Sequence, residues 1–119
     1  MFDIIQKYDR MPFRYGLDCC RFAAECVESI TGKNPMAGIE YSNEAEAYAI
    51  IDRHGDLEGA LRAHLGEPYD GRKDGDVILA ECSDGSQLAG IIFNGVCVVR
   101  TKVGIADWPI RRARLVWET

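Results

Sequence analysis

Hydrophobic residues in the first half of the chain recur at intervals of three, four and seven positions, a spacing that puts them on one face of a helix. The clearest helix is predicted from about Cys19 to Thr31. Its apolar face would consist of Cys19, Phe22, Ala23, Cys26, Val27 and Ile30. Asp18 is suited to cap its amino end, because the carboxylate can accept hydrogen bonds from free backbone amides, and Gly32 is suited to end it.

Three further helical segments are expected, at about residues 2–8, 43–55 and 56–65. The second begins at Asn43, with Glu46 three positions later as in a capping box. The third begins at Asp56 and is stopped by Gly66.

From residue 75 onward apolar and polar positions alternate, which predicts strands at about 76–81, 87–93, 96–101 and 113–117. Asn94-Gly95 is a hairpin turn, because both positions tolerate a positive φ. A polar, turn-rich segment, 67–75, joins a mainly helical half (1–67) to a strand half (75–117). Helices followed by antiparallel strands predict one α+β domain over residues 1–119, with the N-terminal helices packed on a small antiparallel sheet.

Charge and hydropathy exclude several classes of partner. The 119 residues carry a formal net charge of -5, which argues against broad contact with nucleic acid or an anionic membrane. No segment approaches the ~20 apolar residues of a membrane span. The first residues, Met1–Lys7, lack a basic region leading into an apolar run, so we expect no secretory signal peptide.

The five cysteines are an odd number, so a fully paired disulfide scaffold is not expected and reduced thiols are the default. They are Cys19, Cys20, Cys26, Cys82 and Cys97, and none forms a Cys-x-x-Cys pair. Cys19 and Cys26 would lie about 10.5 Å apart along one helix, too far to share a tetrahedral ion. We therefore expect no metal and no cofactor.

Cys19 has the best-defined chemical setting, as the first residue of a helix after its cap. Free backbone N–H groups and the helix dipole stabilise a thiolate there and lower the thiol pKa. Catalysis would also need a base and a donor for the oxyanion. The alternative is that Cys19 and Cys26 are small apolar residues on the buried face. Cys20 lies about 100° around the helix from Cys19 and is expected to face elsewhere.

The stretch Tyr15-Gly16-Leu17-Asp18-Cys19, opening a helix, is followed by Gly75-Asp76-Val77 and a glycine-containing hairpin. This combination resembles the NlpC-type branch of the papain-like cysteine peptidases, and more narrowly the short phage and prophage tail proteins that share its fold. The resemblance covers about residues 12–117. It implies a papain-like NlpC-type fold and places the nucleophile at Cys19.

The same resemblance implies a histidine base at the start of the second strand, where this chain has Leu88. A third polar residue about twelve positions later falls on Arg100. Leucine cannot accept a proton or orient a base, and arginine stays protonated at any relevant pH. By this alignment Leu88 and Arg100 stand at the positions of the lost residues, and the catalytic triad is dismantled.

The chain contains two histidines, His54 and His64, both near predicted helix C-termini. A histidine in the last turn of a helix interacts favourably with the helix dipole, so a solvated, structural role is expected for each. Neither matches the strand position of the missing base.

A second candidate site is an arginine- and tryptophan-rich segment near the carboxyl end, containing Trp108, Arg111, Arg112 and Arg114. Arginine and aromatic residues are enriched in protein interfaces, and a basic patch on an acidic chain suits an acidic partner. The alternative is a solvated turn in which Trp108 and Trp117 pack in the core.

The resemblance implies a structural or assembly component of a phage or prophage tail tip, in the baseplate hub region, built on a catalytically degenerate NlpC-type fold. Its partners would be other tail proteins, and it would occur in the virion tail or in the bacterial cytoplasm during assembly. Two alternatives stay open. One is an active murein cysteine peptidase or amidase with Cys19 as nucleophile, and the other is a module that binds a peptidoglycan peptide without cutting it.

Overall fold

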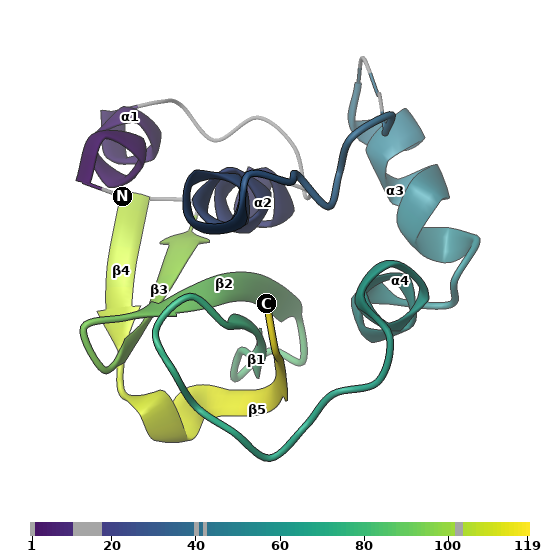
Figure 1. Ribbon diagram of the computed structural model, residues 1–119. Helices are drawn as coiled ribbons and strands as arrows, with labels where there is room; N and C mark the ends of the chain where they lie inside the picture. Colours follow the sequence, from purple (N-terminus) through teal and green to yellow (C-terminus); the bar gives the residue numbers. More distant parts are fainter. Residues whose placement is uncertain (1, 11–17, 40, 42, 102–103) are drawn as a thin grey trace.

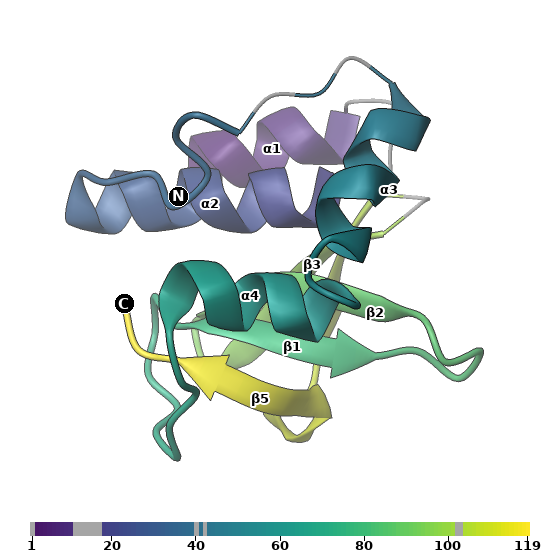
Figure 2. The ribbon, with the colours of Figure 1, turned by 90° about the vertical axis from the view of Figure 1, so that its right-hand side faces the viewer.

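Four helices lie on one side of a five-stranded antiparallel sheet (Figures 1 and 2) in a computed structural model that describes residues 2–10, 18–39, 41, 43–101 and 104–119. The helices are α1 (Phe2–Arg10), α2 (Asp18–Thr31), α3 (Glu44–Asp52) and α4 (Leu57–Leu65). The strands are β1 (Val77–Glu81), β2 (Gln87–Phe93), β3 (Val96–Thr101), β4 (Gly104–Trp108) and β5 (Ala113–Trp117), in the spatial order β4-β3-β2-β1-β5. The expected α+β class, with helices packed on an antiparallel sheet, is confirmed.

Local sequence explains where the helices begin and end. The side chain of Asn43 accepts a hydrogen bond from the backbone N–H of Glu46 (2.9 Å), and Asp56 does the same for Gly59 (2.9 Å). Gly66 ends α4 with a positive φ of 86°. The helix predicted from Cys19 begins one residue earlier, at Asp18, whose side chain lies outside the described part of the structure.

The apolar face predicted for α2 is correct except at its carboxyl end. Phe22, Cys26 and Val27 are buried, whereas Ile30 is 50% exposed. The reason is that the last turn of α2 extends past the apolar core, so that Ile30 contacts the region of Gly75 and not the centre of the sheet.

The predicted hairpin turn has the expected backbone, with φ of 53° at Asn94 and 76° at Gly95. Both turn amides donate to the carboxylate of Asp74, at 3.0 and 3.2 Å. The turn is therefore held to the segment that leads into β1.

Strand β4 and the short 3-10 helix η1 (Ile110–Arg112) were not predicted. The segment treated as one interface candidate, from Trp108 to Arg114, instead spans the end of β4, η1 and the start of β5. β4 is short, half-exposed and at the sheet edge, so its alternation is too weak to detect. The backbone N–H of Ile105 in β4 donates to Asp9 of α1 (3.0 Å), which attaches that helix to the sheet edge.

The two faces of the sheet are covered differently. The helix-side core contains Val77, Leu79, Ala89, Ile91, Val98 and Trp117 together with residues of the helices, such as Tyr8 and Phe22. The opposite face buries Ile78, Ala80, Ile92, Cys97, Val99, Ala113 and Val116. Half-buried side chains, including Tyr69, Trp108 and Ile110, cover this second face.

The joint between the two halves is tied to the sheet by a buried carboxylate. Asp76, fully buried, accepts hydrogen bonds from the Tyr69 hydroxyl, the backbone N–H of Lys73 (3.1 Å) and the backbone N–H of Thr119 (3.4 Å). No helix in the described ranges is both long and apolar enough to span a membrane.

Candidate functional site: a buried thiol pair and the groove beside it

Two adjacent thiols lie at the first turn of α2. Cys19 is fully buried and Cys20 is 8% exposed, and their sulfur atoms are 4.0 Å apart. Contact with Cys19, together with burial, raises the pKa of the Cys20 thiol. Cys20 was expected to face away from Cys19. Because adjacent side chains at the start of α2 both point toward the protein interior, the two sulfur atoms are in contact instead.

The burial predicted for Cys19 and Cys26 is confirmed, since both are fully inaccessible. Removal from solvent raises the pKa of Cys26 to about 12. The environment along this face of α2 therefore favours the neutral thiol over the thiolate.

On β2, Ala89 lines the same apolar cavity as Cys20. Leu88, the residue aligned with the family's histidine, is half-buried and pairs with Ala80 of β1. Both residues contact the helix-side core that contains Cys19 and Cys20, since Ala89 belongs to that core and Leu88 packs against it. Neither Leu88 nor Ala89 carries a group that accepts a proton.

Arg100 is almost completely buried, with 2% of its surface exposed. It follows Val98 by two positions in β3, so it lies on the helix-covered face of the sheet. One of its guanidinium N–H groups donates to the carbonyl of Thr101. The structure therefore places the buried Arg100 guanidinium on the helix-covered side of β3.

The two histidines lie together, which the sequence analysis did not foresee. The rings of His54, just after α3, and His64, in the last turn of α4, are edge to face with centroids 5.7 Å apart. Both are exposed, as expected, and neither imidazole ring hydrogen-bonds to another residue that the structure describes. The pair forms because α3 and α4 pack against each other, which no local pattern specifies.

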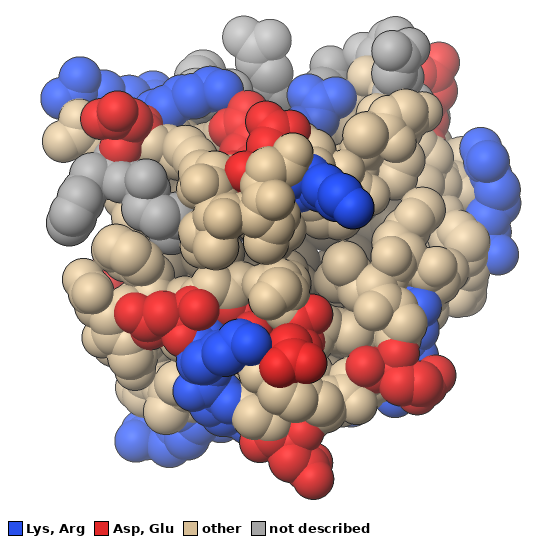
Figure 3. Space-filling view, viewed as in Figure 1, with Lys and Arg blue, Asp and Glu red and all other residues tan. Residues whose placement is uncertain are grey.

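An apolar cavity of about 60 Å³ lies between α2, α3, α4 and the sheet. Figure 3 shows the surface hollowed between α2 and the α3–α4 pair. The walls of the cavity include Ala24 of α2, Met36 and Ile39 of the following turn, Ile50 of α3, and Leu61 and Leu65 of α4. Cys20, Ala89 and His64 also line it.

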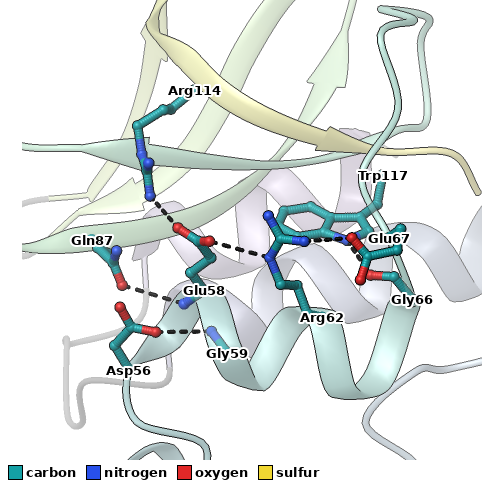
Figure 4. Close-up of polar contacts among 9 residues, drawn as sticks. All are labelled: Asp56, Glu58, Gly59, Arg62, Gly66, Glu67, Gln87, Arg114 and Trp117. Carbon is teal, nitrogen blue, oxygen red and sulfur yellow. Dashed lines mark hydrogen bonds and ion pairs between the residues drawn. The ribbon is translucent and has the colours of Figure 1, made fainter.

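Of the three arginines proposed as interface residues, Arg114 forms ion pairs with other residues of this chain, although its side chain is exposed (Figure 4). It pairs with Glu58 of α4, and its Nε lies 3.8 Å from a carboxylate oxygen of Glu81. Glu58 also pairs with Arg62 (3.1 Å), which pairs in turn with Glu67. Arg114 therefore joins β5 to α4.

The other two arginines of that segment are exposed as well. Arg112 lies over the ring of Trp108, 4.2 Å from its centroid, and Arg111 is exposed. Trp108 is half-buried and packs against the second core, whereas Trp117 is fully buried and donates from Nε1 to the Gly66 carbonyl (2.8 Å). The alternative of core packing is thus correct for Trp117 and partly correct for Trp108.

The described residues contain no group of three histidine, cysteine, aspartate or glutamate side chains placed to hold a metal ion. The Tyr15-Gly16-Leu17 part of the motif lies outside the described residues. No curated protein and no solved structure matches this chain. The model of the family described as "Domain of unknown function (DUF6950)" matches residues 1–119, so the chain belongs to that family.

Proposed function

We propose that this protein is a structural or assembly component of a phage or prophage tail tip, in the baseplate hub region, built on an NlpC-type peptidase fold that has lost its catalytic residues. The observation that carries the proposal is the buried thiol pair at the start of α2. The helix opening at Asp18-Cys19 and packing on an antiparallel sheet is consistent with the implied fold.

A cysteine nucleophile works as an accessible thiolate beside a base. Here Cys19 is fully buried, and the β2 position aligned with the histidine base carries Leu88, followed by Ala89. The guanidinium of Arg100 cannot accept a proton. Each of these features supports a structural role for the thiols.

Contact with other tail proteins would use the surface around η1. Arg111 is exposed, and the Arg112 guanidinium rests on Trp108, an arrangement common where arginine and aromatic residues anchor a protein interface. An acidic partner fits this patch, because the patch is basic on a chain of net charge -5.

The test combines a cleavage assay with particle assembly. We expect the purified protein to release no product from peptidoglycan fragments between pH 5 and 9. In a phage or prophage that encodes the protein, we expect Cys19→Ala to leave particle yield and infectivity unchanged. Cys26→Ala, a buried cysteine on the same helix, is the matched control. Peptidoglycan cleavage that Cys19→Ala abolishes and Cys26→Ala preserves would establish the peptidase alternative instead.

The interface is tested by charge reversal. The double variant Arg111→Glu/Arg112→Glu is expected to reduce incorporation of the protein into particles at least tenfold. Lys33→Glu, at an exposed position after α2, should leave incorporation into particles unchanged. Normal incorporation of the double variant would contradict this location of the interface.

A further inference from the structure

Two hollows of the molecular surface meet between α3 and α4. One is the apolar cavity of about 60 Å³ described above, and the other is a groove of about 380 Å³. Both are lined by Ile39, Ile50 and His64, so the two hollows adjoin, with the apolar cavity as the inner end and the groove as the outer end.

The inner end is apolar. Ala24 and Leu57 are buried there, and Met36, Ile51 and Leu61 are half-buried, so part of their apolar surface faces the space. An aliphatic group inserted here would remove that surface from water, which favours binding. This end therefore fits a short hydrocarbon chain.

The outer end carries hydrogen-bond donors. It is lined by Arg53, which directly follows α3, and by the edge-to-face pair of His54 and His64. Arg53 forms no ion pair with any residue that the structure describes. The groove's carboxylate is Glu46, in the first turn of α3. The guanidinium and the two imidazole rings can all donate hydrogen bonds, so three donor side chains line this end beside one carboxylate, a set that suits the acceptor oxygens of a carboxylate ligand.

We infer that the space between α3 and α4 binds a small amphipathic carboxylate. Its hydrocarbon chain would lie in the apolar cavity, and its carboxylate would lie between the Arg53 guanidinium and the imidazoles. Binding sites for small molecules commonly combine an apolar pocket with a few convergent polar groups at its mouth. This inference is independent of the tail-tip proposal, because it uses neither the cysteines as nucleophiles nor the surface around η1.

The experiment is an NMR titration of the isotope-labelled protein with three eight-carbon compounds that differ only in the head group: octanoate, 1-octanol and octylammonium. We expect saturable shifts at residues 34–39, in α3 and in α4. Octanoate should bind most tightly, 1-octanol less tightly and octylammonium most weakly. The dissociation constant should rise at least fivefold at each step of this order. Arg53→Gln should weaken octanoate binding at least fivefold and leave 1-octanol binding unchanged.

Two further variants complete the test. Leu61→Trp fills the apolar end and should abolish binding of both octanoate and 1-octanol, while Arg111→Gln, on η1 and far from α3 (Figure 1), should change nothing. If Leu61→Trp fails to fold, the octanoate and 1-octanol affinities of Arg53→Gln alone test the inference. Equal affinities for octanoate and 1-octanol, no saturable binding, or full octanoate affinity in Arg53→Gln would each overturn the inference.

Discussion

A cysteine at the amino end of a helix experiences two opposing effects. The helix dipole and free N–H groups favour the thiolate, and loss of solvent disfavours it. Where the pKa directions are defined, in Cys20 and Cys26 of α2, burial contributes to an increase in the thiol pKa. Desolvation likewise raises the pKa of Cys97 in β3. At the residue scale the thiols therefore behave as core side chains.

These pKa shifts predict how stability depends on pH. A thiol whose pKa is higher in the folded protein than in the unfolded chain contributes stability below about pH 9, and this contribution is lost as pH rises. For Cys26, whose folded pKa is about 12, the loss extends from about pH 9 to pH 12. Tyr69, whose pKa is raised to about 12 by its hydrogen bond to Asp76, adds a further loss above about pH 10. Urea unfolding at pH 8 and pH 10 should show a lower free energy of unfolding at pH 10.

The contribution of one thiol is measured by substitution. Cys26→Ala should make the decrease in the free energy of unfolding between pH 8 and pH 10 smaller by about 1 kcal/mol. The control is Cys82→Ala, because Cys82 is half-exposed. An identical pH dependence in wild type and Cys26→Ala would contradict the assignment.

At the element scale, α4 is held to the sheet by polar contacts at both ends (Figure 4). Near its amino end Glu58 pairs with Arg114 of β5, and its backbone N–H donates to the side chain of Gln87 (3.3 Å). At its carboxyl end the Gly66 carbonyl accepts from Trp117 (2.8 Å). These contacts fix one wall of the groove between α3 and α4.

A double-mutant cycle tests the charged part of this attachment. Glu58→Gln and Arg114→Gln should each lower the free energy of unfolding, with a coupling of about 0.5–1 kcal/mol, because the side chains are only partly shielded from solvent. The coupling should shrink at high salt, since partly exposed charges are screened. A control cycle uses Lys73 and Glu118, which form a more exposed pair. Zero coupling for Glu58 and Arg114 at low salt would show that the pair does not stabilise the fold.

At the scale of the whole molecule the sheet has one thickly covered face and one thinly covered face. The helices cover the first, whereas the second depends on a few side chains near β4, η1 and the 69–76 segment. Trp108 can therefore act in two ways. It packs against the second core, and it contributes to the surface proposed to bind a partner protein.

Trp108→Ala separates these roles. Because the half-buried ring packs against the second core, the variant should lose about 2 kcal/mol of unfolding free energy, measured by urea denaturation. Arg112→Ala removes the cation over the ring and a long hydrogen bond to the Glu81 carbonyl (3.5 Å), and it should cost about 0.5–1 kcal/mol. A Trp108→Ala protein of unchanged stability would show that the ring contributes nothing to the core.

Much of the local structure follows from short-range patterns. Helix positions follow from three- and four-residue spacing, with Asn43 and Asp56 as caps, and the hairpin follows from Asn94-Gly95. β4 was missed because an edge strand with half-exposed residues lacks a clear alternation. The absence of a histidine at the second strand is also a property of the sequence alone.

Packing between distant segments settled the rest. No local pattern specifies the contact of the two thiols, the cavity that Ala89 and Cys20 both line, the pairing of His54 with His64, or the ion pair of Arg114 with Glu58. The physical reason is that spacing and capping act within one element, over a few residues. The partners of a side chain depend instead on strand register, where one residue reverses the face, and on how whole helices pack.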